Sequence, residues 1–277
     1  MTIIIFFIFG LIIGSFLNVL AYRISIAETI LGRSFCPKCK KQISWYDNVP
    51  LLSFILLRAK CRNCKKKISW QYPLMELFTA AIFAGIGAKF FDAGVAVSWI
   101  ETGYYLTMAS ALIVIFIYDW LYMEIPGIVL WPAIFAAVGF NLWLDWNGVS
   151  DLGEFGNVLS LGWLGMLGLK TPSGVLAAAA AFTFFFSLSA MSREKWMGMG
   201  DAYLAILLGL ILGWPQILLA LFLAFAIGAI YGIILISLKK KKMKSQIPFA
   251  PFLIAGTLIA IFFHQPIISW YLGLFIV

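Results

Sequence analysis

Long uninterrupted apolar stretches dominate this chain and decide what it can fold into. Hydrophobic residues make up 63% of the 277 positions and only 12% are charged, and the mean hydropathy is +0.99. Lipid offers the backbone no hydrogen-bond partners, so such a chain must form membrane helices or a closed barrel. The apolar runs do not alternate with polar residues, as barrel strands would. The sequence therefore predicts an all-α, polytopic bundle of membrane-spanning helices.

About eight of the runs are candidate spans. The first has no basic residues before it and runs directly into Arg23, so we expect a retained anchor and not a cleaved signal peptide. The sixth is short unless it begins inside the preceding glycine-rich stretch, and the tail after residue 264 extends the last span or lies at the membrane interface. The predicted spans are residues 2–22, 74–91, 99–118, 126–144, 173–191, 201–214, 217–238 and 248–264.

Basic residues fall almost entirely in alternate loops, which predicts an orientation. Of the 20 Lys and Arg residues, eleven lie between Arg23 and Lys67, two at 193 and 195, and five between 239 and 244. Only Lys89 and Lys170 fall in the other loops. By the positive-inside rule, the basic loops are cytoplasmic and the N-terminus is outside.

All four cysteines lie in one predicted cytoplasmic loop, residues 23–73, as two C-x2-C pairs. Twenty-one residues separate the pairs, a spacing close to that of zinc ribbons. Four thiolates complete a closed tetrahedral Zn²⁺ site without room for a reactive water, so we expect a structural metal. Free thiols or a redox pair are the alternative, and disulfides are disfavoured in the cytoplasm. The predicted ligands are Cys36, Cys39, Cys61 and Cys64.

The basic residues around these cysteines have three interpretations. They can simply follow the topology rule, contact anionic lipid headgroups, or engage an acidic or membrane-bound substrate. A nucleic-acid partner is not expected, because membrane segments flank the loop on both sides. The predicted division is an anchor at 1–22, the cysteine loop at 23–73 and a membrane-embedded domain at 74–277.

Two aspartates are the best candidates for chemistry. The chain has a single histidine, His264, so histidine-dependent nucleophilic and metal schemes are nearly excluded. Asp119 ends the third predicted span and Asp201 opens the sixth, both at the cytoplasmic side. Two carboxyl groups brought together in low dielectric share a proton, which is the machinery of aspartic proteolysis. Glu124 competes for the first position, and Glu76 and Glu194 are weaker competitors.

The glycines of "GMGD" suggest a substrate-facing turn. Without a Cβ, Gly198 and Gly200 can adopt positive φ and let another chain approach closely. A substrate strand lying against this turn would present its scissile bond to Asp201. The alternative is that the glycines only break the chain between two helices.

Taken together, these motifs resemble the prepilin peptidases, or type IV leader peptidases, over roughly residues 10–80 and 110–256. Five blocks in order carry the resemblance: "GLIIGSFLNVLAYRI" (10–24), "CPKC" through "ISWQYPLMEL" (36–77), "YDWLYMEIP" (118–126), "GMGDAYLAILLGLILGWP" (198–215) and "IPFAPFLIAGTLIA" (247–260). The chain differs from common family patterns at Tyr203, where many members are basic, and at Gly127, where many are acidic.

The resemblance implies a membrane aspartic protease of the GxGD type in the bacterial inner membrane, with Asp119 and Asp201 as the catalytic pair. Such enzymes cleave basic leaders from prepilins and type II secretion pseudopilins on the cytoplasmic side. Many then methylate the new N-terminus with S-adenosylmethionine, and the cysteine loop belongs to that part. The substrate's apolar segment would pack among the spans as a helix. Acids such as Glu28, Asp47 or Glu194 would contact the basic leader.

The sequence carries no derivable S-adenosylmethionine site. Polar candidates in the N-terminal part are Ser15, Asn18, Arg23, Asp47, Asn48 and Glu76. Three other functions stay open: a leader peptidase that lacks methyltransferase activity, a proton-coupled transporter that uses the same acids, and an assembly platform without enzymatic activity. A transporter would be expected to show inverted repeats.

Overall fold

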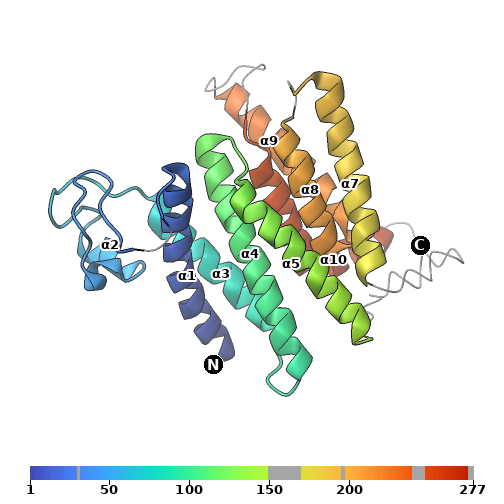
Figure 1. Cartoon of the computed structure of the whole chain (residues 1–277), viewed down its shortest axis with the longest axis horizontal. Coiled ribbons are helices and arrows are strands. Elements are labelled where there is room, and N and C mark those ends of the chain that lie inside the picture. The colour runs from blue at the N-terminus through green and yellow to red at the C-terminus, as the bar shows by residue number, and fades with distance from the viewer. Residues whose placement is uncertain (30–31, 149–169, 195–196, 239–246, 274–277) are drawn as a thin grey trace, which may run out of the picture. The chain divides into compact units, whose positions relative to one another are not determined.

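The structure, a computed structural model, describes residues 1–29, 32–148, 170–194, 197–238 and 247–273. Lys195 and the lysine cluster at 239–244 lie outside the described residues. The described part is helical, and its only β-type pairings are two isolated bridges. The elements of Figure 1 are α1 (Thr2–Ser25), η1 (Trp45–Asn48), α2 (Leu52–Leu56), α3 (Gln71–Phe90), α4 (Ala96–Tyr122), α5 (Gly127–Trp146), α7 (Lys170–Ser192), α8 (Met199–Leu212), α9 (Gln216–Ser237) and α10 (Ala250–Gly273).

Within the described ranges, seven helices are long and apolar enough to cross a membrane: α1, α3, α4, α5, α7, α9 and α10. They confirm the predicted polytopic helical class. The sixth predicted span, α8, begins inside the glycine motif at Met199 but has only 14 residues, about 21 Å, which is less than the hydrocarbon core of about 30 Å. The C-terminal tail extends α10 as helix through Gly273.

The chain forms two compact units, Met1–Tyr118 and Asp119–Val277. In the first, α1 packs closely on α3 because two glycines, one helical turn apart, leave no side chains in between. A Cβ at Gly10 would lie 2.6 Å from the Cα of Ala80, and one at Gly14 would lie 2.9 Å from the Cα of Glu76. This contact sets Glu76 against α1. The predicted boundary at residues 73 and 74 stays a prediction.

In the second unit, α8 is almost completely enclosed by its neighbours. It fits tightly against α7 because Gly209 has no Cβ, which would otherwise collide with the Ala178 backbone. On the other side of this contact, α7 carries five consecutive alanines at 177–181. The Asn141 side chain of α5 donates a 2.9 Å hydrogen bond to the Leu210 carbonyl. A short helix held this firmly places its first turn, which carries Asp201, at a fixed position.

Candidate functional site

Each C-x2-C pair forms a knuckle, and the two knuckles share one backbone pattern. In the first, Cys36 N–H donates to the Lys41 carbonyl (2.9 Å) and Lys40 N–H donates to the Cys36 carbonyl (2.8 Å). In the second, Cys61 pairs in the same way with Lys66 and Lys65, both at 2.9 Å. Lys40 and Lys65 take positive φ values of 58° and 56° to close these turns, and an isolated bridge supports each knuckle.

The knuckles bring all four cysteines to one point. The four Sγ atoms lie within 4.8 Å of one another, and Cys36 is buried. A tetrahedral zinc site with Zn–S bonds of about 2.3 Å has its sulfurs about 3.8 Å apart, so the cluster needs only a small contraction to hold a metal. This four-cysteine cluster can therefore bind a metal ion, and its donor set suits zinc.

The thiols of this cluster differ in proton affinity. The Cys64 backbone N–H, helped by that of Asn63, lowers the pKa of the Cys61 thiol to about 7 in spite of partial burial. For Cys39, the Lys41 N–H lowers the pKa, but burial and hydrogen bonds to the Cys36 and Cys64 thiols outweigh it and raise the pKa to about 11. One sulfur is therefore ready to ionise while a neighbour holds its proton, so metal binding must displace protons.

Asp47 is engaged within the loop by Arg62. The Arg62 Nε and Nη2 atoms donate to the two Asp47 carboxylate oxygens, both at 2.7 Å, and the guanidinium lies 5.4 Å from the Tyr46 ring centroid. The hydrogen bonds from Arg62 lower the pKa of the Asp47 carboxyl. This bidentate pair ties the second knuckle to η1, so Asp47 already has a cationic partner within the chain.

Asp119 lies in the last turn of α4 with only 5% of its surface exposed. The Ala250 backbone N–H, at the start of α10, donates to its carboxylate. The other oxygen, Oδ2, is buried and has no hydrogen-bond partner among the described residues. An unpartnered carboxylate oxygen is costly to bury, and it remains available to hydrogen-bond a substrate or water.

Asp201 is the third residue of α8 and is 9% exposed. Its own N–H donates to the Gly198 carbonyl at 3.2 Å, and its carboxylate accepts from the Gly198 N–H. This reciprocal arrangement resembles a capping box and fixes the side-chain rotamer. The Asp119 and Asp201 carboxyl groups lie close enough for their charges to interact. Both acids that the sequence singled out are therefore buried, and their action as a catalytic pair stays a prediction.

The glycine motif does not use the positive φ that its glycines permit. Gly198 has φ −72° and ψ 152°, the extended conformation that any residue adopts before a helix, and Gly200 lies within α8. The two glycines differ in how much room a side chain would have at each position. A Cβ at Gly200 would press on the Ile125 side chain at 3.3 Å, whereas one at Gly198 would meet nothing closer than the Gly200 nitrogen at 3.9 Å. The surface beside Gly198 is open.

The competing acids lie elsewhere. Glu124, Glu194 and Glu28 are exposed, and the Glu76 carboxylate is used inside the first unit, where it accepts the Leu51 N–H at 2.8 Å. His264 is part of the continuing α10 helix, with Nδ1 3.1 Å from the Ala260 carbonyl. Among the acids in the described part of the chain, Asp119 is the one whose charge acts on Asp201.

Several polar candidates for a methyl-donor site cluster where α1 meets α3. The Ser15 hydroxyl donates to Glu76, and Asn18 donates to the Tyr72 carbonyl at 3.4 Å while its buried Oδ1 has no partner. The buried Arg23 donates at 3.0 Å to the carbonyls of Gly32 and Arg33. Asn48 is exposed in η1.

Sequence reasoning missed the backbone and aromatic groups around the acids. The sequence does not indicate the role of the Ala250 amide, although Ala250 lies in the block "IPFAPF" that carries part of the family resemblance. Phe249, the residue before it, contacts the rings of Phe185 (6.1 Å) and Phe225 (5.0 Å). A backbone donor has no sequence signal of its own, since every residue except proline carries one.

Comparisons with known proteins agree over nearly the whole chain. Residues 8–90 match the family model described as the bacterial peptidase A24 N-terminal domain, and residues 106–233 match that of the type IV leader peptidase family. A prepilin leader peptidase/N-methyltransferase from Bacillus subtilis (strain 168) is 30% identical, with 97% of each chain covered. Proteins of the same name from Aeromonas hydrophila (30% identical, 98% of this chain and 93% of the relative) and Legionella pneumophila (27%, 96% and 93%) are also similar. No solved structure matches.

Proposed function

Because this chain belongs to the prepilin leader peptidase/N-methyltransferase family, we propose that it cleaves the basic leader from type IV prepilins and type II secretion pseudopilins and then N-methylates the new N-terminus. The observation that carries the peptidase half is the pair of buried, interacting carboxyl groups of Asp119 and Asp201. An assembly platform without enzymatic activity would leave this pair without a role.

The two carboxyl groups supply both proton transfers that peptide hydrolysis needs. One carboxylate removes a proton from water as the water oxygen adds to the scissile carbonyl carbon, while the protonated partner donates to the carbonyl oxygen. The amide nitrogen then takes the proton that the first carboxyl group removed from water, a hydroxyl of the tetrahedral intermediate returns a proton to the partner carboxylate, and the C–N bond breaks. Gly198 N–H holds Asp201 in place, and Ala250 N–H holds Asp119. The unpartnered Oδ2 of Asp119 is the oxygen that we assign to water or substrate.

We further propose that the four-cysteine cluster holds one structural Zn²⁺. With four sulfur ligands the ion has no open coordination position, so its contribution is to the folding of a loop with little apolar core. The methyl donor is S-adenosylmethionine, and the polar group around Ser15, Asn18 and Glu76 is the candidate contact region in this chain. The acids and the cysteine loop face the cytoplasm of a bacterial inner membrane, in keeping with the distribution of basic residues.

The direct test is the intact mass of a prepilin after incubation with the detergent-solubilised protein and S-adenosylmethionine. The wild type is expected to remove the leader and add one methyl group. Asp119→Asn and Asp201→Asn should leave the precursor whole, whereas Glu124→Gln, which removes an exposed carboxylate two residues before the Pro126 turn, should behave as the wild type.

Three results would revise the proposal. Cleavage by both Asn variants would remove the acid pair from the mechanism and reopen the transporter and platform functions. Loss of activity in Glu124→Gln would show that a different acid matters. Leader removal without methylation would leave a peptidase that lacks the second activity.

A further inference from the structure

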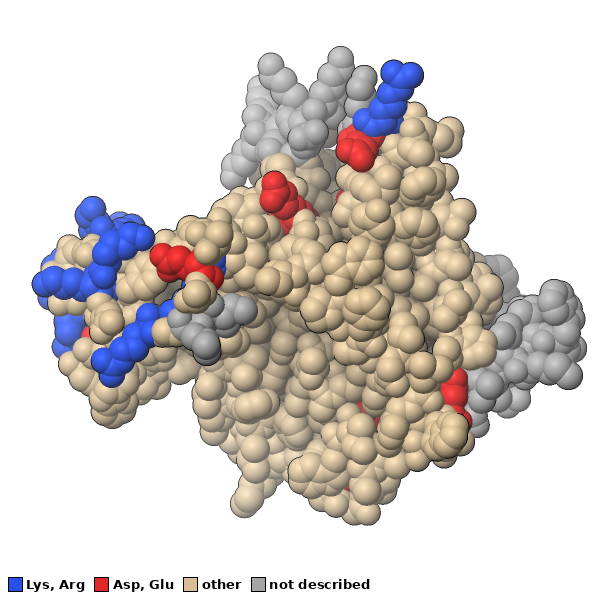
Figure 2. Space-filling view, viewed as in Figure 1, with Lys and Arg blue, Asp and Glu red and all other residues tan. Residues whose placement is uncertain are grey.

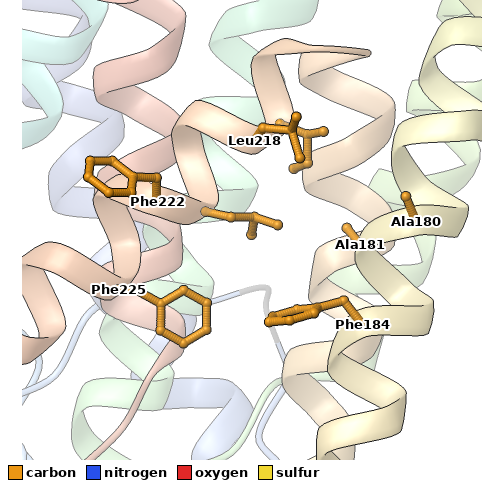
Figure 3. A pocket seen from close by; sticks show the side chains of 8 residues that line it. Ala180, Ala181, Phe184, Leu218, Phe222 and Phe225 are labelled. Carbon is orange, nitrogen blue, oxygen red and sulfur yellow. The ribbon is translucent and has the colours of Figure 1, made fainter.

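An apolar groove lies between α7 and α9 in the second unit (Figure 3). Its volume is about 270 Å³. Phe184 and Phe225 face each other across it in Figure 3, and two alanines form its wall on α7. The side chains that line it include Ala180, Ala181 and Phe184 of α7 and Leu218, Phe222 and Phe225 of α9.

One end of the groove lies at the level of the acids. Phe225 contacts the Phe249 ring at 5.0 Å, and Phe249 directly precedes Ala250, whose N–H holds Asp119. On the other wall, Phe185 follows Phe184 and stacks on Phe225 at 6.1 Å. A short chain of contacts therefore connects the end of the groove at Phe225 to the catalytic acids.

The other end of the groove points to the opposite side of the membrane. α9 begins at Gln216, directly after α8 has run inward from Asp201, so Leu218 lies far from the acid-bearing end. From Leu218 to Phe225 the helix rises about 10 Å, nearly two turns. The groove thus starts beside the acids and runs away from the cytoplasmic side along α9.

This direction is the one that the uncut substrate must take. If the scissile bond is cut at the cytoplasmic ends of the spans, the apolar segment that follows it has to run from the acids toward the outer face. We propose that this groove binds the first two turns of the apolar helix that follows the scissile bond. This inference rests on the proposed function.

The groove is better shaped for a helix than for a lipid chain alone. Ala180 and Ala181 allow close approach of a second helix, as small residues do in membrane helix pairs. Phe222, Leu218 and Phe184 are 68%, 49% and 45% exposed, so the groove opens sideways and a substrate helix can enter from the bilayer. Large rings beside a small-residue wall leave room for bulky apolar side chains of the substrate.

The test fills the groove with a large side chain. Ala180→Trp adds an indole at an exposed groove position, and Ala179→Trp makes the same change at the neighbouring exposed position that does not line it. Both variants are assayed on a full prepilin and on a peptide that ends a few residues after the scissile bond. Ala180→Trp should raise KM for the full substrate by about tenfold with kcat little changed, and should leave cleavage of the short peptide unchanged.

A photo-crosslinking residue adds a second readout that does not depend on the tryptophan variants. Benzoylphenylalanine at Leu218 should crosslink to the apolar segment of the precursor. The same residue at Ile230, which is 59% exposed further along α9, should not.

The outcomes separate this inference from the proposed function. If the wild type cuts neither substrate, the proposed function fails. If it cuts both, but Ala180→Trp matches Ala179→Trp and Leu218 crosslinks only to lipid, the groove holds lipid and the inference is overturned. The inference would also be overturned if Ala180→Trp lowered cleavage of the short peptide and of the full prepilin equally. The substitution would then be acting on the acids and not on binding of the apolar helix.

Discussion

The cysteine loop and the acid pair are built in opposite ways. The metal ligands come from two local knuckles in one loop, each closed by its own backbone hydrogen bonds. The acids come from positions 119 and 201, on α4 and α8, and α8 is held in place by its packing against α7 and α5. Figure 2 shows the difference in setting, since the loop carries a dense group of Lys and Arg side chains whereas the helices of the second unit present a mostly uncharged face.

This difference determines what each site depends on. A knuckle is specified by spacing within a few residues, so it forms wherever a metal completes it. A buried acid pair is specified by packing over many helices, and its charges are tolerated only because that packing holds them. The comparison predicts that the two sites respond independently to mutation.

The largest expected effect is on the acids. Asp119→Asn or Asp201→Asn should each lower the cleavage rate by about 10³-fold or more, and the double variant should be no worse, because both groups act as one unit. Metal content should not change. The measurement is single-turnover cleavage of a prepilin together with metal analysis of the same preparations. Additive losses in the double variant would mean that the acids act separately.

The next largest effect is on the metal. Cys61→Ser should reduce bound zinc from about one per chain to near zero and lower N-methylation by more than about tenfold, with cleavage changed less than about threefold. Metal analysis and product mass on one sample provide both values. Cys61 is the informative position because its pKa of about 7 makes it the readiest thiolate. If cleavage falls as steeply as methylation, the two sites are not independent.

The same comparison explains how much the sequence could predict. Spacing alone identified Cys36, Cys39, Cys61 and Cys64, because the local backbone geometry follows from C-x2-C. Burial of Asp119 and Asp201 could be expected from their place at apolar helix ends, but the fixed position of α8 could not, since it depends on contacts between residues far apart in the sequence, such as that between Asn141 and Leu210. The φ value of Gly198 could not be predicted, because glycine permits positive φ without requiring it.

A smaller effect is expected at Gly198. Among the described residues, a Cβ there meets nothing closer than the Gly200 nitrogen at 3.9 Å, and its φ and ψ suit any residue, so Gly198→Ala should fold with an unchanged thermal midpoint. If a substrate strand lies against this turn, KM should still rise by several-fold, about three- to tenfold. Gly200→Ala, which presses on Ile125 at 3.3 Å, is the contrasting variant whose effect includes intramolecular packing. An unchanged KM in Gly198→Ala would show that no substrate approaches this turn.

The smallest expected effect is on the ion pair of the cysteine loop. Half of the Arg62 side chain is exposed, at 53%, and solvent screens such pairs. In a cycle of Arg62→Gln and Asp47→Asn, zinc affinity measured by chelator competition should change at most about fivefold. Arg62 lowers the pKa of Asp47, so the pair contributes fully above the ordinary pKa of an aspartate and is lost only as the pH falls through the lowered value. The effect of either variant should therefore be the same at pH 6 and pH 8, whereas zinc affinity itself should rise over that range as the cysteine thiols lose protons. If the effect of either variant on zinc affinity changed between pH 6 and pH 8, Arg62 would be acting on the thiolates directly. The loop, like the acid pair, would then depend on longer-range electrostatics.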